Sequence, residues 1–294
     1  MERIKPNKTV TAILCSDFHL REDKPVCRTD NYWETQWKKV DFISDLQKKY
    51  GCPIWHGGDL FHHWKPSPEL LSMTSQHIPN MFVTVYGNHD LPQHNLDLVQ
   101  KCGIYNLMVN AKISVLQNGH WGQSLGDGRT GFIINNKQAT IQHIMTYQGV
   151  EPWPGCTDPK ASKLLRQHKQ FDLILTGDNH KSFVEEFEGR LLVNPGSIMR
   201  MTADQADFQP RVALWFAEDN SIEWVNLPIQ KDVISREHLA VKEERDVRIN
   251  AFVSSLNLKS NDVIGMSFEQ NLDAFFQINT IRDSVKQIIY KAIE

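Results

Sequence analysis

The sequence has no excess of basic residues, and this absence bears on the class of partner. Lys and Arg number 32 against 35 Asp and Glu, which gives a formal net charge of −3. The overall positive field of a histone-like or sequence-reading DNA-binding protein is therefore missing. Two divalent cations held by carboxylates would bring the formal charge from −3 to +1. Net charge alone thus does not decide whether the chain binds nucleic acid.

Long apolar runs and paired cysteines are also absent. No window approaches the roughly 20 apolar residues of a membrane span, and the N-terminal MERIKPNKTV contains no apolar stretch of signal-peptide length. The five cysteines are odd in number, scattered, and form no C-x-x-C pair, which argues against a disulfide framework. We expect a reduced, cytoplasmic protein without a membrane segment.

Short apolar runs alternate with amphipathic stretches over the first two-thirds of the chain. Compact runs rich in β-branched or aromatic residues predict buried strands at 10–15, 53–55, 81–86, 140–145 and 171–175. A helix is predicted between the first two, because apolar residues recur there at steps of three and four from Trp33 to Tyr50. Trp33 and Trp37 belong to this stripe, which favours a place in the core over a base-stacking platform.

The pattern changes from Phe183 onward. Before this point, Ser67-Pro68-Glu69 predicts the start of a helix that runs toward His77. After it, hairpins are predicted for 183–193, turning at Glu188-Gly189, and for 212–227, turning at Asp219-Asn220. We therefore expect an α/β fold in which helices cover two sheets. A boundary near Gln230 separates this domain, 1–230, from a C-terminal helical appendage, 231–294, with a helix over about 272–293.

Polar residues gather where the predicted strands end. In an open α/β sheet the carboxyl ends of parallel strands line one edge, so clusters far apart in sequence can meet in one crevice. Asp, His and Asn together are typical ligands of divalent metals of intermediate hardness. The clusters are Ser16-Asp17-Phe18-His19-Leu20, Gly57-Gly58-Asp59-Leu60-Phe61-His62, Gly87-Asn88-His89-Asp90, Gln142-His143 and Gly177-Asp178-Asn179-His180.

The spacing within these clusters suits a pair of ions. Asp17 and His19 are two residues apart, so in an extended segment both side chains point the same way. The carboxylate of Asp59 has two oxygens and can bridge two ions. A purely structural role would require buried carboxylates without partners beside apolar strands, which is costly. Buried acidic residues in this setting indicate a functional site.

This set of motifs resembles the signature of calcineurin-like metallophosphoesterases over roughly residues 10–228. The resemblance implies a four-layer αββα fold and a two-metal phosphoesterase centre. A finer similarity, to SbcD-type nucleases of double-strand break processing, rests on Gly58 to His62, on Pro66-Ser67-Pro68 and on Asn194-Pro195-Gly196-Ser197. The run 194–205 is also similar to compact SbcD-type exonucleases encoded by bacteriophages.

The resemblance assigns ligands to each ion. It places Asp17, His19, Asp59 and His180 on one metal, and Asp59, Asn88, His143 and Asp178 on the other. Position 178 departs from the family, which usually has histidine there. A carboxylate favours harder ions, so we expect Mn²⁺ rather than Zn²⁺. Should Asp178 point away, the second ion would bind weakly.

Three further residues receive roles by resemblance or position. His89 is expected to stabilise developing charge or to protonate the leaving oxygen, oriented by Asp90; the alternative is that His89 only orients its neighbours. His62 resembles a nuclease-specific histidine near the scissile phosphate, although His63 and Trp64 show that such residues abound in this loop. Arg200, which follows the turn at Pro195-Gly196-Ser197, is expected to bind substrate phosphate.

We expect two-metal-dependent hydrolysis of DNA phosphodiester bonds, by an exonuclease or endonuclease acting in end processing, repair or recombination. Two alternatives stay open. One is a phosphodiesterase or phosphatase for nucleotides or other small phosphoesters, because one fold serves many substrates; the other is a weakly catalytic DNA-end-binding scaffold. The resemblance also implies an SbcC-type ABC ATPase partner and a homodimer. Alternatively, the apolar face of the C-terminal helix packs on its own domain.

Overall fold

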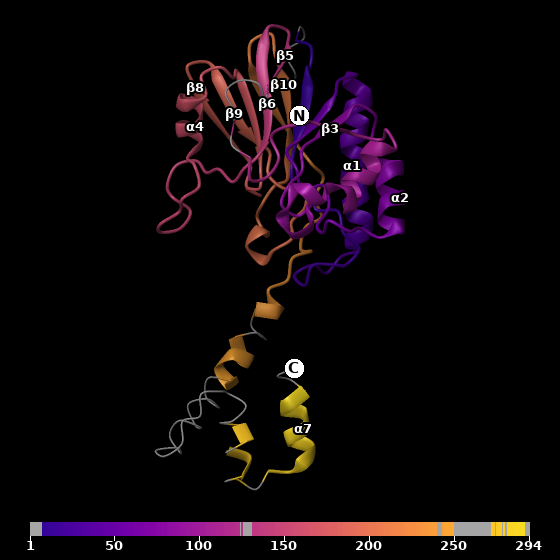
Figure 1. Cartoon of the computed structure of the whole chain (residues 1–294), viewed down its shortest axis with the longest axis vertical. Helices are drawn as coiled ribbons and strands as arrows, with labels where there is room; N and C mark the ends of the chain where they lie inside the picture. Colours follow the sequence, from indigo (N-terminus) through magenta and orange to yellow (C-terminus); the bar gives the residue numbers. More distant parts are fainter. Residues whose placement is uncertain are drawn as a thin grey trace. The chain divides into compact units, whose positions relative to one another are not determined.

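The computed structural model describes residues 8–123, 125, 131–239, 243–249, 272–273, 275–277, 279 and 281–291. The chain divides into two compact units, Met1–Ser235 and Arg236–Glu294. The first unit is built on two mixed sheets with helices on their outer faces (Figure 1). It confirms the predicted α/β class.

The first sheet has six strands in the order β11-β10-β1-β2-β3-β4. The four strands β1 to β4 run parallel to one another, and β10 and β11 pair antiparallel at one side. Every residue of β1 and of β2 is buried, as expected for strands with covered faces. The strands are β1 Ala12–Cys15, β2 Ile54–His56, β3 Phe82–Thr84, β4 Ser114–Val115, β10 Arg211–Phe216 and β11 Ser221–Asn226.

The second sheet has five strands in the order β5-β6-β7-β9-β8. Its centre, β6, β7 and β9, is parallel, and antiparallel β5 and β8 form its edges. The turn between β8 and β9 is the predicted Glu188-Gly189, and both residues have positive φ (52° and 70°), as a tight hairpin turn requires. The strands are β5 Phe132–Ile134, β6 Lys137–His143, β7 Leu173–Gly177, β8 Phe183–Phe187 and β9 Arg190–Asn194.

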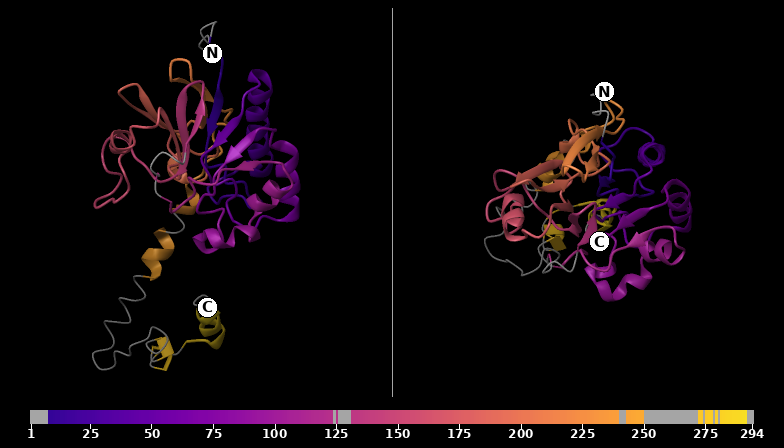
Figure 2. Two further views of the ribbon diagram at one scale, coloured as in Figure 1. Left: turned by 45° about the horizontal axis from the view of Figure 1, so that its top comes forward. Right: turned by 90° about the horizontal axis from the view of Figure 1, so that it is seen from above.

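Helices cover the outer face of each sheet. In Figures 1 and 2, α1 and α2 lie on one side of the paired sheets and α4 lies on the other. Ser67 caps α2, as predicted, and accepts a hydrogen bond from the backbone N–H of Leu70. Asn31, which was not predicted as a cap, does the same for α1 by accepting from the N–H of Glu34. The α-helices of this unit are α1 Tyr32–Tyr50, α2 Pro68–His77, α3 Gly103–Val109 and α4 Ala161–Gln167; the 3₁₀ turns are η1 Pro92–His94, η2 Leu96–Lys101 and η3 Ala203–Gln205.

Three apolar cores follow from this layering. One lies between α1, α2, α3 and the first sheet, and contains Trp37; Trp33 packs at its border, which confirms that this stripe is core. The second core lies between the sheets, around Trp55 and Trp215. The third lies between the second sheet and α4, around Phe171. The central strands β1, β2 and β7 are buried throughout, so polar side chains are accessible at their ends.

The second unit departs from the predicted single helix over 272–293. Residues 272–273 and 275–277 are helical, but Asn279, Ile281 and Arg282 are not, and helix α7 spans Asp283–Lys291. The side chain of Asn279 donates to the carbonyl of Phe275, as its own backbone N–H does, and such competition ends a helical turn. Ile278 and 292–294 lie outside the described residues. None of the helices in the described parts of the chain has the length and hydropathy to cross a bilayer.

Candidate metal centre

The ends of five strands bring the predicted polar clusters together. Asp17 and His19 follow β1, Asp59 follows β2, and Asn88 follows β3 of the first sheet. From the second sheet, His143 is the last residue of β6, and Asp178 and His180 follow β7. Pairing fixes this edge, because Cys15 is opposite His56 in the first sheet and His143 is opposite Gly177 in the second. The two sheets therefore meet with their carboxyl ends at one place.

Asp59 stands at the middle of the cluster. Its Oδ2 is 3.6 Å from His19 Nε2 and 3.6 Å from His143 Nε2. This oxygen is buried and has no hydrogen-bond partner among the described residues. Asp59 Oδ1, in contrast, accepts the backbone N–H of His89 at 2.9 Å. The free oxygen thus lies between two histidines from different sheets, where a bridging ligand would stand.

On one side of Asp59 lie Asp17, His19 and His180. His180 Nε2 is 4.0 Å from Asp17 Oδ1 and 3.0 Å from His19 Nε2. Two imidazole nitrogens at 3.0 Å repel each other unless a proton or a cation stands between them. These three residues are able to converge their ligand atoms on one ion, as the resemblance predicts.

On the other side lie His143, Asn88 and Asp178. His143 Nε2 is 3.1 Å from Asn88 Oδ1 and 3.9 Å from Asp178 Oδ1. The carboxylate of Asp178 thus faces the cluster rather than away from it. Asp17, Asp59 and His143 also form a group able to converge on one ion. The other six residues predicted as ligands therefore lie around Asp59.

Local contacts fix the orientation of these ligands. Nδ1 of His143 donates to the carbonyl of Gly57 at 2.7 Å, which leaves the Nε2 lone pair for a metal. Ser16 Oγ donates to Asp17 Oδ2 at 2.5 Å, and the backbone N–H of Asp178 donates to Asp17 Oδ1. The Asp17 carboxylate is held in place from both sheets.

The backbone at the cluster is strained. Asp17, His19, Asp59 and Asp178 have φ of 52°, 46°, 57° and 80°, in the left-handed region that costs a residue with a side chain about 1–2 kcal/mol. Four of the seven predicted ligands therefore adopt a conformation that is otherwise uncommon. Such strain concentrates at functional sites, where surrounding structure enforces it.

The pKa shifts within the cluster favour the binding of cations. Burial, together with the carboxylates of Asp90 and Asp17, raises the pKa of Asp59 well above its usual value. Burial likewise raises the pKa of Asp178, and burial and the neighbouring imidazoles lower the pKa of His19. Divalent cations would relieve each of these perturbations, because they favour carboxylate and neutral imidazole. The donor set, three carboxylates, three imidazoles and one amide oxygen, fits a pair of divalent ions.

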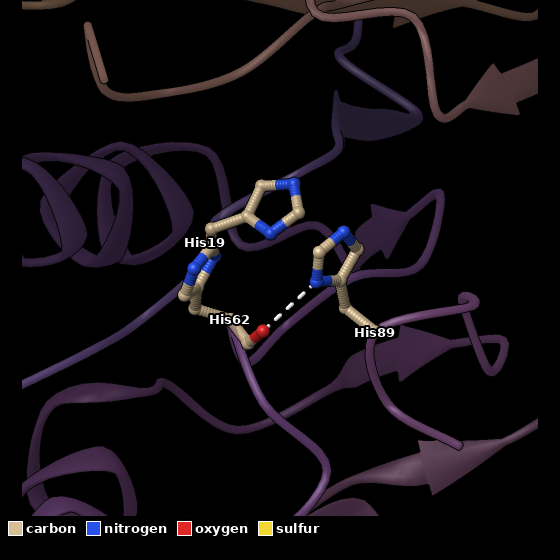
Figure 3. Close-up of side chains that lie close together, drawn as sticks. All are labelled: His19, His62 and His89. Atoms are coloured by element: carbon tan, nitrogen blue, oxygen red, sulfur yellow. Dashed lines mark hydrogen bonds between the residues drawn. The ribbon is translucent and has the colours of Figure 1, made fainter. Parts of the chain in front are cut away.

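His89 and His62 lie beside His19, one of the predicted ligands (Figure 3). Their rings are stacked at 5.3 Å, and the ring of His89 stands at 90° to that of His19 with centroids 4.8 Å apart. The prediction that Asp90 orients His89 is wrong. His89 Nδ1 donates instead to the carbonyl of His62 at 2.8 Å, and the Asp90 carboxylate accepts backbone N–H groups at residues 59–61 and 87. Asp90 fixes the turn that carries Asp59, and the His62 carbonyl orients His89.

Arg200 is not brought to the cluster by any contact of the described residues. It is 5% exposed, and its guanidinium donates to the carbonyls of Ala206 and Gln230. These bonds tie the loop after β9 to the segment after β11, and the Nε of Arg200 is buried without a hydrogen-bond partner among the described residues. The expected phosphate-binding role of Arg200 gains no support from its contacts.

A cavity of about 670 Å³ opens beside Asp178 and His180. Its wall continues through Lys181 and Phe208 to the carboxylates of Asp204 and Asp207. Sequence reasoning missed this cavity. It placed Ser16 and Gly57 in the polar clusters but did not predict their hydrogen bonds to Asp17 and His143. Backbone acceptors have no side-chain signal, and the cavity depends on a loop whose path the sequence does not reveal.

Comparison with known proteins identifies one matching family. The family model of the calcineurin-like phosphoesterase superfamily domain matches residues 11–215. No curated protein matches the sequence.

Solved structures similar to this chain include an archaeal phosphodiesterase, at 13% identity and a TM-score of 0.45, with 74% of this chain and 99% of that one covered. Another is vacuolar protein sorting 29 of Cryptosporidium parvum, at 15% identity, a TM-score of 0.39 and coverages of 76% and 100%. A third is a predicted phosphoesterase of Streptococcus pneumoniae TIGR4, at 13% identity, a TM-score of 0.35 and coverages of 76% and 93%.

Proposed function

The chain belongs to the calcineurin-like phosphoesterase superfamily, and we propose that it is a DNA nuclease of the SbcD type that hydrolyses phosphodiester bonds with two divalent ions, Mn²⁺ foremost. The observation that carries the proposal is the buried Oδ2 of Asp59, 3.6 Å from both His19 and His143. A carboxylate oxygen between two groups of ligands suits a bridged pair of ions. When bound, such a pair polarises a phosphoryl group and lowers the pKa of water.

The protein side of the reaction follows from the residues around the centre. Asp17, His19 and His180 would hold one ion, Asn88, His143 and Asp178 would hold the other, and Asp59 lies between the two groups. His89 presents Nε2 to the site, because its Nδ1 is bound to the His62 carbonyl. We assign to this nitrogen the proton that the leaving oxygen receives. His62 lies 5.3 Å behind it, measured between ring centroids, and positions it through that carbonyl.

The substrate class rests on the sequence similarity to SbcD-type nucleases and on the size of the cavity. A cavity of about 670 Å³ beside His180 holds more than a phosphate group and can take the nucleoside that adjoins the scissile bond. Binding of DNA would come mainly from backbone phosphates and the metal centre, with little reading of base sequence. An SbcC-type ATPase partner and a homodimer remain part of this proposal.

A second candidate is a phosphodiesterase for nucleotides or other small phosphoesters. The cavity wall gives it some support, because it carries Asp204 and Asp207 as well as Lys181 and Arg211 and so offers no continuous basic track for the backbone of a polymer. A weakly catalytic DNA-end-binding scaffold has less support, because Asp178 faces His143 and leaves the second ligand group complete.

Incubation with end-labelled duplex and single-stranded DNA in Mn²⁺ tests the proposal, with bis(4-nitrophenyl) phosphate as a small substrate and His89→Ala as the control. We expect DNA to be degraded and the variant to lose about 10²–10⁴-fold in rate, the usual contribution of a general acid. Turnover of the small ester with intact DNA would replace the nuclease by the second candidate. Binding of DNA ends without turnover of either substrate would establish the scaffold.

A further inference from the structure

Three imidazole rings gather at the edge of the metal centre and form a group of their own (Figure 3). Ring centroids are 4.8 Å apart for His19 and His89, 5.3 Å for His62 and His89, and 5.7 Å for His19 and His62. Each residue offers one nitrogen that lies within 4.8 Å of those of the other two. The other two convergent groups in the described part of the chain both contain Asp17, whereas this histidine triad consists of imidazoles alone.

Backbone contacts fix the positions of the three histidines relative to one another. Leu20 and Phe61 form a parallel bridge, the N–H of His19 donates to the carbonyl of Asp59, and the N–H of His62 donates to that of Leu20. The third ring is fixed to the second through the bond from His89 Nδ1 to the His62 carbonyl. The loops after β1, β2 and β3 therefore present three rings with little freedom, as a binding site requires.

Two nitrogens of the histidine triad lack partners. Nδ1 of His19 and Nδ1 of His62 are buried, and neither has a hydrogen bond within the described residues. The second nitrogen of a metal-ligating histidine is nearly always bound to a carboxylate, carbonyl or water. A buried polar atom left without a hydrogen bond is unfavourable. The two unpartnered nitrogens indicate that a ligand binds between these rings.

We propose that His19, His62 and His89 form an additional, inhibitory site for a borderline divalent ion such as Zn²⁺. Imidazole donors suit Zn²⁺, whereas the carboxylates of the neighbouring centre suit Mn²⁺. A tetrahedral ion with Zn–N distances of about 2.0–2.1 Å needs its nitrogens roughly 3.4 Å apart. The rings would thus close by no more than about 1.4 Å from the 4.8 Å limit of their present separation.

His19 couples the two sites. Its Nε2 is 3.0 Å from His180 and 3.6 Å from Asp59, so it belongs to the metal centre as well as to the histidine triad. A neutral imidazole has a single lone pair, so a His19 that binds Zn²⁺ in the triad is withdrawn from the centre. The same ion also binds His89, which then has no nitrogen available to protonate the leaving oxygen. Zn²⁺ in the triad therefore opposes catalysis; this inhibition rests on the proposed function, whereas binding itself does not.

The test measures the amount of zinc bound by the full chain with and without the histidine triad. Wild type, His62→Gln and His63→Gln are dialysed against excess Zn²⁺, and bound metal is counted by native mass spectrometry. His63 is the matched control, because it is the adjacent histidine, is exposed and lies outside the triad. We expect His62→Gln to bind one Zn²⁺ fewer than wild type and His63→Gln to bind the same number.

Inhibition gives a second reading. With Mn²⁺ supporting hydrolysis of bis(4-nitrophenyl) phosphate, each variant is compared with its own rate without zinc. The Zn²⁺ concentration for half inhibition should rise at least tenfold in His62→Gln and stay unchanged in His63→Gln. If His62→Gln fails to fold, judged by circular dichroism, His89→Gln replaces it in the zinc count. Equal zinc counts in wild type and the folded triad variant would overturn the proposal, and absent Mn²⁺-dependent hydrolysis would overturn the proposed function alone.

Discussion

Replacing Gly87 by alanine should disable the metal centre through a steric clash at a known place. A Cβ at position 87 would stand 2.0 Å from Asp59 Oδ1 and 2.4 Å from the backbone nitrogen of Asp59, where ordinary contacts begin at 3.4 Å. Because one of these atoms belongs to the backbone, the turn that carries Asp59 must move by about 1 Å. Gly87 is not in the left-handed region, so the effect is one of space and not of backbone conformation.

The expected loss can be given a size. A displacement of about 1 Å in a catalytic group costs roughly 10²-fold in rate, and overpacking costs about 1–3 kcal/mol in the free energy of unfolding. The assay is Mn²⁺-dependent hydrolysis of bis(4-nitrophenyl) phosphate. Gly189→Ala is the control, because its φ of 70° makes alanine costly by about 1–2 kcal/mol although open space surrounds it. A Gly87→Ala enzyme within threefold of wild type would refute the placement of Asp59.

Three further predictions concern metal, the Asp59 turn and a buried lysine. Each Mn²⁺ ion bound at 100 times its dissociation constant should raise the free energy of unfolding by about 2.7 kcal/mol, so the pair should raise Tm by at least the roughly 5–11 °C expected for one ion. Asp59→Asn should remove most of this gain, and an equal gain in both proteins would contradict the site. Asp90→Asn should lower stability in urea by at least about 1–3 kcal/mol, because an amide cannot accept from all the backbone donors that face Asp90; an unchanged midpoint would show that these bonds are dispensable. Lys39 is 2% exposed and donates to the Ile198 carbonyl. Burial, and to a lesser extent the charges of Arg28 and Arg200, lowers the pKa of Lys39 to about 7, although Asp30 acts in the opposite direction. Since an unfolded lysine keeps its proton to about pH 10.4, the unfolded state binds more protons between these values, and stability should rise over pH 7–10 relative to Lys39→Met; parallel pH profiles of the two proteins would exclude a buried, neutral Lys39.

The sequence predicted the described strands other than β4 and β5, together with their polar ends, because both signals are local. The run of β1 is apolar throughout, and Asp17 and Asp59 come within three residues of the ends of β1 and β2. The convergence of clusters could then be inferred from the rule that parallel strands end at one edge. The hairpin turn at Glu188-Gly189 was equally visible, since glycine satisfies its positive φ.

Other features depend on contacts that no local pattern contains. Arg200 resembled a phosphate ligand by its place after a turn, yet the structure uses its guanidinium to hold two backbone carbonyls. Asp90 follows His89 in sequence, but its carboxylate turns toward the loop of Asp59 because four backbone N–H groups converge there. The short helices α3 and α4, each of seven residues, are stabilised by packing more than by their own periodicity.

Anomalous X-ray scattering from crystals of the Mn²⁺-loaded protein would most directly test whether two ions bind at Asp59. The account predicts two manganese peaks about 3.5–4 Å apart, both touching the carboxylate of Asp59, one also bound by His180 and the other by His143. Manganese that touches neither Asp59 nor these histidines would contradict it.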